Sequence, residues 1–266
     1  MLYLNEEFGQ AWGDKDPYSI VRSQSGKIYR QVKSRRTLQF MLNGNSYFLK
    51  YHGGVGWLEI FKNLLQFRLP IVSAANEWQA IQRLKQLRID TMLPVAYGKR
   101  GISPASFESF IVTQDLVETV SLEEFCNNWQ HNAPSFRSKQ ILIEKVANIA
   151  RQMHTHGICH RDFYLCHFLL RPAQLETCTL VDLNLYLIDL HRALVRNHLT
   201  SRWIEKDVAG LYFSSMDLGL TMRDLLRFMR TYRNLPIRQI LKQDTRFWKR
   251  VKTKAENLYR KIHGVN

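Results

Sequence analysis

The chain has 266 residues, 45% of them hydrophobic, which suits one large domain or two closely packed lobes and excludes disorder along the whole chain. A spanning helix needs about 20 apolar residues, and the apolar runs here are shorter and interrupted by acids, which argues against a transmembrane helix. The first residues are acidic and do not resemble a secretory signal, so we expect a cytoplasmic protein.

The net charge of +15 is concentrated in the C-terminal part of the chain. From Arg192 onward, 17 lysines and arginines stand against 6 acidic residues, a net charge of +11. Such a field attracts a polyanion, which can be nucleic acid, an anionic membrane surface or an acidic protein. Composition alone does not choose among these partners. The four cysteines form no C-x-x-C pair, which favours reduced thiols.

The first 120 residues are predicted to consist mostly of strands. Residues 27–37 provide one strand and a basic connection, and residues 37–52 alternate around Asn43-Gly44, which is typical of a hairpin. The glycines of residues 53–56 indicate a loop, and residues 59–69 a short amphipathic helix that Pro70 stops.

A longer helix and two further strands complete this part of the chain. Residues 75–89 place Trp78, Ile81, Leu84 and Leu87 at helical spacing, which predicts one buried helix face. Residues 92–101 and 107–116 have the pattern of strands joined by a turn.

From Ser121 onward the pattern becomes helical. Ser121 begins a helix in residues 121–129, and residues 139–157 form a long helix that ends at a glycine. Residues 167–172 and 185–193 are predicted to be paired short strands, and the chain after Asp207 is helical and basic. We therefore predict an α+β fold class with two lobes. A small β-rich N-lobe with one main helix, residues 1–120, binds the nucleotide, and a larger helical C-lobe, residues 121–266, carries the catalytic loop.

The sequence HRDFYLCHFLL at residues 160–170 begins like the catalytic loop of a protein kinase. In kinases the Asp of His-Arg-Asp accepts the proton of the acceptor hydroxyl, and an Asn five positions later binds magnesium. Asp162 is therefore the candidate base, with His160 and Arg161 in supporting positions. His167 stands in the Asn position.

Imidazole is a poorer ligand for magnesium than an amide oxygen, so His167 has three alternative roles. It is a weak metal ligand, or it forms a hydrogen bond with a phosphate or with the Asp162 loop. In the third alternative, a single Mg²⁺ held mainly by Asp189 is sufficient. Asp189 stands where kinases have Asp-Phe-Gly, although the glycine is missing here.

Two further groups are candidates for binding the phosphates of ATP. Lys50 ends a strand and Glu77 lies in the helix that follows, the arrangement of the lysine and glutamate that form an ion pair in kinases. The glycine-rich loop of kinases is missing. We expect a nucleotide-covering loop between the first two strands, where Lys33, Arg35 or Arg36 would replace the glycines.

A cluster of histidines and cysteines near the loop offers an alternative, a zinc site. Its members are His154, His156, Cys159, His160, Cys166 and His167. Zinc sites usually contain two spaced pairs of ligands that bracket a loop, and this spacing is missing. The sequence therefore disfavours zinc.

Several segments together resemble the bacterial lipopolysaccharide core heptose kinases, sugar kinases with a fold like that of eukaryotic protein kinases. The segments that carry the resemblance are RRTLQF, SYFLKYHGGVGWLEIFKNLLQFRLP, NEWQAIQRL, HGICHRDFYLCHFLL, LYLIDLHRA and KDVAGLYFSS. They span about residues 28–215, most of the chain. The histidine in the Asn position is itself a mark of this family.

The resemblance implies that the chain uses ATP and Mg²⁺ to phosphorylate the first heptose of the inner core, at its O4 hydroxyl. The substrate would be the lipid A-core glycolipid at the cytosolic face of the inner membrane. By position, Asp162 would be the base, Lys50 and Glu77 would serve ATP, and Asp189 would bind magnesium. Asp207 would brace the catalytic loop, or else it is a helix cap.

The C-terminal charge fits peripheral contact with an anionic membrane surface, with an acidic protein as a further partner and no nucleic acid. Two other functions remain as alternatives. A protein kinase acting on Ser, Thr or Tyr would need a peptide-positioning segment, and the sequence has no Ala-Pro-Glu match. A catalytically silent kinase-like binding module for an anionic partner would leave Lys50, Glu77, Asp162 and Asp189 without a reason to occur together.

Overall fold

The computed structural model describes residues 1–32, 34–54, 57, 73–103, 106–132, 134–175 and 182–264, without the side chains of residues 174 and 175. The chain divides into two compact units, Met1–Gln82 with Met92–Val117, and Arg83–Thr91 with Glu118–Asn266. The boundary expected at residues 120 and 121 lies close to this division. The short helix expected at residues 59–69 lies outside the described residues.

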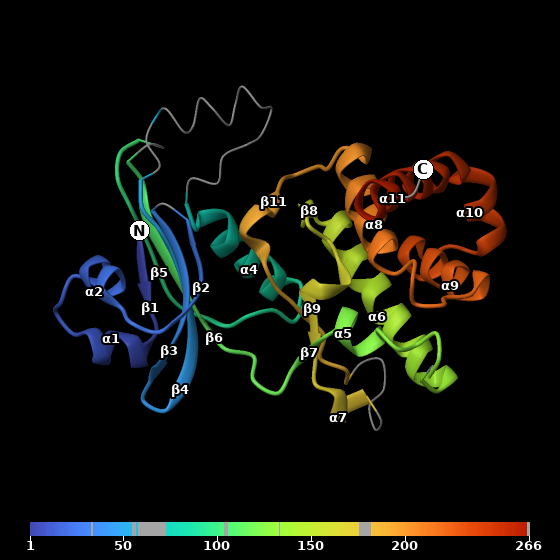
Figure 1. Cartoon of the computed structure of the whole chain (residues 1–266). Coiled ribbons are helices and arrows are strands. Elements are labelled where there is room, and N and C mark those ends of the chain that lie inside the picture. The colour runs from blue at the N-terminus through green and yellow to red at the C-terminus, as the bar shows by residue number, and fades with distance from the viewer. Residues whose placement is uncertain are drawn as a thin grey trace. The chain divides into compact units, whose positions relative to one another are not determined.

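A six-stranded antiparallel sheet forms the first unit, in the order β1-β5-β6-β4-β3-β2 (Figure 1). The strands are β1 Leu2–Leu4, β2 Lys27–Val32, β3 Arg35–Leu42, β4 Asn45–His52, β5 Pro94–Arg100 and β6 Glu108–Gln114. The predicted hairpin is present as β3 and β4. Asn43 and Gly44 join these strands with φ angles of 50° and 81°, and a two-residue hairpin turn with both φ values positive is type I′.

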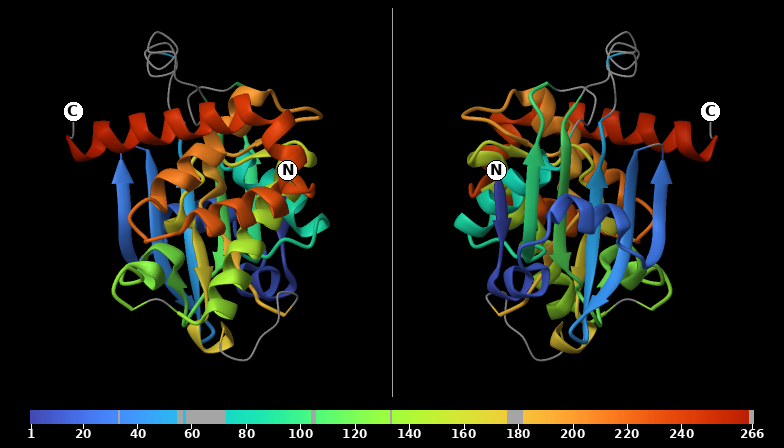
Figure 2. Two further views of the ribbon diagram at one scale, coloured as in Figure 1. Left: turned by 90° about the vertical axis from the view of Figure 1, so that its right-hand side faces the viewer. Right: turned by 90° about the vertical axis from the view of Figure 1, so that its left-hand side faces the viewer.

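Two short helices that the sequence analysis did not predict cover one face of this sheet, as the right-hand view of Figure 2 shows. They are α1 Glu6–Trp12 and α2 Pro17–Ser23. Asn5 and Asp16 cap them by accepting the backbone N–H groups of Phe8 and Tyr18. The buried residues that join the helices to the sheet are Phe8, Trp12, Tyr18, Val21, Leu38, Phe40, Tyr47, Leu49, Val95, Ala96, Phe110 and Val112.

The opposite face of the sheet carries helix α4, Ala75–Gln86. Trp78 stacks on Tyr97 of β5 with ring centroids 4.6 Å apart. The helix ends three residues before the predicted end at residue 89, because Leu87 and Arg88 form a turn in which Arg88 has a φ of 55°. Lys50 of β4 points to this same face, since strand side chains alternate and the adjacent Leu49 lies in the core against α1 and α2.

The described part of the second unit is mainly helical. Its helices are α5 Leu122–Cys126, α6 Phe136–Thr155, α7 Pro172–Leu175, α8 Ser201–Ser214, α9 Met222–Arg233, α10 Ile237–Gln243 and α11 Thr245–His263. Helix α6 packs against α9, and α8 packs against α11. Ser121 caps α5, as predicted, by accepting the N–H of Glu124. The long predicted helix is α6, which begins earlier than expected because Ser135 is its N-cap.

Short strands and two 3₁₀ turns connect these helices. Strands β7 Val120–Ser121, β9 Phe168–Leu170 and β10 Tyr186–Leu187 form one sheet, β8 Ile158–Cys159 pairs with β11 Leu194–Val195, and the 3₁₀ turns are η1 Leu165–His167 and η2 Leu190–Arg192. The predicted pairing of the strands that flank residues 172–184 is thus observed as β9 and β10.

Gly157 lies at the point where α6 ends and β8 begins. Its φ is 76°, and an added Cβ would lie 1.7 Å from the backbone oxygen of Arg196. Only glycine fits this close approach, because any side chain would clash with that backbone. The chain therefore enters the segment that begins at His160 from a fixed position.

Candidate active site

Lys50 and Glu77 form an ion pair within the first unit. The Lys50 Nζ lies 2.8 Å from Oε1 of Glu77, and the Glu77 side chain is only 1% exposed. Lys50 is in the interior of the sheet, where β4 pairs with both β3 and β6, so the backbone that carries it is held on both sides. Because an isolated buried carboxylate is costly, this pair fixes the direction of the lysine side chain.

Asp207 holds the backbone of the predicted catalytic loop. Its Oδ2 accepts the N–H of His160 at 2.6 Å, and its Oδ1 accepts the N–H of Arg161 at 2.8 Å. Arg161 has a φ of 72°, a left-handed conformation that is costly for a residue with a side chain. Hydrogen bonds to a charged acceptor are strong, so Asp207 stabilises this strained turn. Asp207 lies inside α8, whose N-cap is Thr200, so it is not a helix cap.

The charge of Asp207 is stabilised although the side chain is almost fully buried. Burial opposes ionisation, but the hydrogen bond and the electrostatic attraction of His154 hold the pKa of Asp207 below its ordinary value. Nε2 of His154 lies 3.4 Å from Asp207 Oδ2, and Nδ1 of His154 lies 2.8 Å from the hydroxyl of Tyr232 on α9. Helices α6, α8 and α9 are thus joined through one polar network beneath the loop.

Asp162 directs its carboxylate toward Arg192. Nη1 of Arg192 lies 2.7 Å from Oδ1 and 3.1 Å from Oδ2 of Asp162. The Asp162 side chain is 17% exposed, which leaves it accessible. Arg161, in contrast, carries its guanidinium over the ring of Trp203, 5.1 Å from the ring centroid.

His160 connects the loop to the segment that carries Asp189. The His160 side chain is fully buried, and its Nε2 donates to the backbone oxygen of Ile188 at 2.9 Å. Burial lowers the pKa of His160, which keeps the ring neutral at pH 7. The N–H of Ile188 donates in turn to the backbone oxygen of His167 at 2.9 Å. These bonds bring Asp162, His167 and Asp189 into one compact group.

His167 and Asp189 face each other within this group. Nδ1 of His167 lies 2.7 Å from the backbone oxygen of Asp162, and because a carbonyl can only accept, Nδ1 carries the proton. Of the alternatives for His167, the hydrogen bond to the Asp162 loop is therefore present. In the neutral ring the lone pair is on Nε2, which lies 3.6 Å from Asp189 Oδ2. Asp189 Oδ1 accepts from Nδ1 of His191 at 2.6 Å.

The three basic residues expected to cover the nucleotide differ in their positions and contacts. Arg36 donates to the backbone oxygens of Val21 and Arg22 at 2.8 and 3.0 Å, so its guanidinium serves the C-terminal end of α2. Arg35 lies at the start of β3 opposite His52. Lys33 lies outside the described residues. The roles of these residues toward ATP stay predictions.

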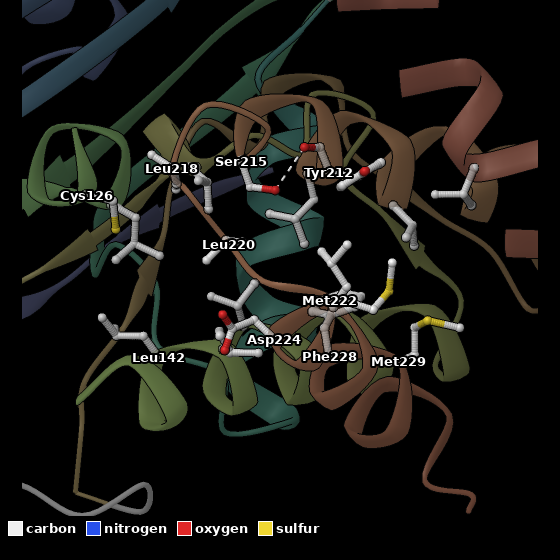
Figure 3. A pocket seen from close by; sticks show the side chains of 18 of the residues that line it. Cys126, Leu142, Tyr212, Ser215, Leu218, Leu220, Met222, Asp224, Phe228 and Met229 are labelled. Carbon is white, nitrogen blue, oxygen red and sulfur yellow. Dashed lines mark hydrogen bonds between the residues drawn. The ribbon is translucent and has the colours of Figure 1, made fainter. Parts of the chain in front are cut away.

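An apolar cavity of about 270 Å³ lies among α5, α6, α8, α9 and α11 of the second unit (Figure 3). Its lining includes Cys126, Leu142, Val146, Leu165, Val208, Leu211, Leu218, Leu225, Phe228, Met229 and Val251. Two of the polar groups at its wall are already bonded to other groups. Asp224 forms a capping box with Thr221 and lies 2.7 Å from the Lys139 Nζ, and the hydroxyl of Ser215 donates to the backbone oxygen of Tyr212.

Arg192, His191 and this cavity were not predicted from the sequence. His191 and Arg192 follow shortly after Asp189 in the sequence LYLIDLHRA. Their position next to a candidate metal ligand could have identified them as candidate site residues. The cavity has no comparable local signal, because its walls come from five separate helices.

Comparisons with known proteins give one consistent result. The model of the lipopolysaccharide kinase (Kdo/WaaP) family matches residues 20–232. The lipopolysaccharide core heptose(I) kinase WaaP of Escherichia coli is 45% identical over 259 residues, which is 97% of each chain. Its counterpart from Pseudomonas aeruginosa is 46% identical over 258 residues, covering 97% of this chain and 96% of that one.

A solved structure, WaaP in complex with acyl carrier protein, is 42% identical in sequence. It has a TM-score of 0.84 and covers 97% of this chain and 99% of that chain. This likeness confirms the predicted α+β fold of the protein kinase-like type.

Replacing Asp207 by Asn tests the role of its charge. The Asp207→Asn protein should lose about 3 kcal/mol of unfolding free energy at pH 7, because an amide presents only one acceptor to two N–H donors. Since the folded-state pKa of Asp207 is lowered, its stabilisation is present above the ordinary pKa of 3.8 and is lost as pH falls below it. Denaturant unfolding from pH 7 to 3.5 should therefore show the difference between wild type and variant shrinking below about pH 4.

Asp217→Asn is the matched control, since Asp217 also accepts a hydrogen bond, from Tyr259, but at the surface. It should change the unfolding free energy by less than about 1 kcal/mol. A difference between wild type and Asp207→Asn that is constant across this pH range would contradict the account.

Proposed function

The chain belongs to the lipopolysaccharide kinase (Kdo/WaaP) family, and on this premise we propose that it transfers the terminal phosphoryl group of ATP to the first heptose of the lipopolysaccharide inner core. The O4 hydroxyl is the proposed acceptor. Identity of about 45% over 97% of the chain to two core heptose(I) kinases supports a sugar acceptor over a protein one. The observation that carries catalysis, as opposed to silent binding, is the accessible carboxylate of Asp162 on a loop fixed by Asp207.

Asp162 is the proposed base. As the heptose oxygen forms its bond to the γ-phosphorus, the bond from that phosphorus to the β,γ-bridging oxygen breaks, and ADP leaves with the electron pair. The proton of the heptose hydroxyl passes to the Asp162 carboxylate. The left-handed backbone of Arg161 and the two backbone hydrogen bonds that Asp207 accepts support this role, because they fix the backbone that carries the Asp162 side chain.

Lys50 is the proposed contact with the phosphates of ATP, and Glu77 is the residue that directs it. A flexible lysine loses much rotamer freedom when it binds a phosphate. The ion pair with Glu77 already restricts the Lys50 side chain, so less freedom remains to be lost on binding. The 2.8 Å contact to a buried carboxylate supports this assignment.

Asp189 and His167 are the residues proposed to hold Mg²⁺. These two side chains provide part of a magnesium-binding donor set. Asp189 offers carboxylate oxygens, and His167 directs the lone pair of Nε2 toward them. The other ring nitrogen of His167 is bonded to a backbone carbonyl, which fixes the orientation of the ring. Magnesium prefers oxygen and usually keeps waters and substrate phosphates as ligands, so two protein groups suffice. When bound, the ion would neutralise charge on the transferring phosphoryl group.

Peripheral binding at the cytosolic face of the inner membrane is proposed, with the lipid A-core glycolipid as substrate. Among the described residues, none of the helices has the length and apolar content that crossing a bilayer requires. The net charge of +11 from Arg192 onward supports attraction to an anionic surface, where each basic residue contributes about 1 kcal/mol.

Acyl carrier protein is the proposed protein partner, and the cavity of Figure 3 is the proposed site for its acyl group. A WaaP structure 42% identical to this chain is a complex with acyl carrier protein, which supports the partner. The cavity supports the acyl group, because its lining is mostly apolar and the side chains of Asp224 and Ser215 at its wall are already bonded to other groups. The exposed basic residues of α9 and α11, such as Arg230 and Lys249, support the attraction of an acidic partner.

Phosphate transfer tests the proposed reaction. Wild-type protein incubated with radiolabelled ATP and heptose-bearing core glycolipid should incorporate label, and Asp162→Asn should lower kcat by about 1,000-fold or more because the proton has no acceptor. Glu256→Gln is the control, since Glu256 forms only an exposed pair with Lys252 on α11, and it should leave kcat unchanged. No incorporation by wild type, or an unaffected Asp162→Asn variant, would refute the reaction or the base respectively.

Titration with acyl carrier protein tests the partner and the cavity. The acylated form should bind more tightly than the unacylated form, and each methylene added to a short acyl chain should increase affinity about fourfold, which corresponds to about 0.8 kcal/mol. Val146→Phe, which fills the cavity, should reduce this gain, measured by calorimetry.

The matched control is Leu241→Phe, which adds similar bulk at an exposed position on α10. It should preserve the dependence on acyl chain length. Equal affinity for both forms of the carrier protein would show that the cavity does not accept the acyl group.

A further inference from the structure

The predicted catalytic loop contains no cation after its base. Phe163, Tyr164, Leu165 and Cys166 fill the positions between Asp162 and His167. Arg161, which precedes the base, packs over Trp203 and forms no hydrogen bond to the Asp162 carboxylate. Phosphoryl transfer nevertheless requires positive charge beside the reacting oxygens, because charge spreads over the transferred group. A cation from elsewhere in the chain, next to the base, would add to the charge that Lys50 and Mg²⁺ are proposed to supply.

Arg192 is such a cation, and the fold brings it to Asp162 through the short β8–β11 ladder. Leu194 pairs with Cys159 and Val195 with Ile158 in antiparallel register. In that register, residues just before Leu194 lie opposite residues just after Cys159, which places Arg192 beside the Asp162 loop. Two buried neighbours, Leu190 and Ala193, fix the 3₁₀ turn that carries the arginine.

The contact between Arg192 and Asp162 leaves most of the guanidinium available. One nitrogen, Nη1, contacts both carboxylate oxygens, at 2.7 and 3.1 Å. Within the described residues, Nε and Nη2 donate to no other group, and the Arg192 side chain is 37% exposed. Arginine has five N–H donors in a planar fork, which suits simultaneous contact with a carboxylate and a phosphoryl oxygen. The donors that Asp162 does not use are therefore open to a phosphoryl oxygen beside the candidate base.

We propose that Arg192 is a second catalytic residue for this reaction. It holds the Asp162 carboxylate in the orientation that accepts the heptose proton, and its remaining N–H groups donate to the transferred phosphoryl group. The guanidinium stays protonated throughout, so it stabilises charge without taking part in the proton transfer. This inference rests on the proposed kinase function and assigns to it a residue outside the His-Arg-Asp loop.

Steady-state kinetics of Arg192 variants test the inference. Arg192→Ala should lower kcat about 100-fold while the KM values for ATP and glycolipid change less than about threefold, because the lost contacts form mainly in the transition state. Arg192→Lys should retain an intermediate kcat, since a lysine keeps the charge but loses the fork. Guanidinium ion at low, non-denaturing concentration should raise kcat of Arg192→Ala about tenfold and leave Asp162→Asn unchanged.

Readouts besides activity separate this role from a structural one. ATP affinity by calorimetry and the thermal unfolding temperature should be nearly equal in wild type and Arg192→Ala. Arg196→Ala is the matched control, because Arg196 lies four residues further along, is exposed and forms no ion pair with the rest of the described chain. It should behave as wild type.

Two results would overturn the inference with the proposed function intact. One is an active wild type with Arg192→Ala within about threefold of its kcat. The other is equal loss of kcat and of thermal stability in Arg192→Ala and Arg192→Lys, without rescue by guanidinium. A wild type that incorporates no phosphate would instead overturn the proposed function, and the inference with it.

Discussion

A single buried carboxylate, that of Asp207, determines the shape of the catalytic loop. Its two oxygens accept the N–H groups of two consecutive residues, His160 and Arg161, and a side chain can do this only if the backbone between them turns sharply. The turn requires a left-handed Arg161, which costs of order 1–3 kcal/mol for a residue with a side chain. Two charge-assisted hydrogen bonds offset this cost. The loop thus keeps one conformation before any substrate binds.

The groups around the loop depend on this conformation. His160, buried and neutral, bonds to the backbone of Ile188 and so ties the segment that carries Asp189 to the loop. His167 bonds to the backbone oxygen of Asp162, which leaves its second nitrogen facing Asp189. Arg192 reaches Asp162 because β8 and β11 pair in a fixed register. A change in the loop backbone would therefore displace the base, the candidate metal ligands and the arginine together.

Local patterns in the sequence predicted the parts of the structure that depend on neighbours in the chain. The hairpin of β3 and β4 was predictable because Asn43-Gly44 suits a two-residue turn with positive φ angles. The pairing of Lys50 with Glu77 followed from a strand that ends in lysine and a helix with an acidic first turn. Helices α1 and α2 were missed, although Asn5 and Asp16 are good N-caps, because helices of seven residues give little periodicity.

Contacts between distant segments were not predictable in the same way. Arg192 and Asp162 are 30 positions apart and meet through a ladder of two residue pairs, too short to leave a pattern in the sequence. Asp207 could be read as a brace or as a helix cap, because aspartate is common at both places. Only the structure decides this, by showing α8 beginning six residues earlier, at Ser201. The apolar cavity arises where five helices fail to fill the space among them, a result of packing that no segment records.

Amide hydrogen exchange at His160 and Arg161 is the most direct test of the claim that Asp207 fixes the catalytic loop. The account predicts that both amides exchange only when the second unit unfolds, at rates comparable to those of buried amides in α8. Exchange as fast as that of the exposed loop residues Asn197 and His198 would show that the hydrogen bonds to Asp207 do not hold the loop, and would contradict the account.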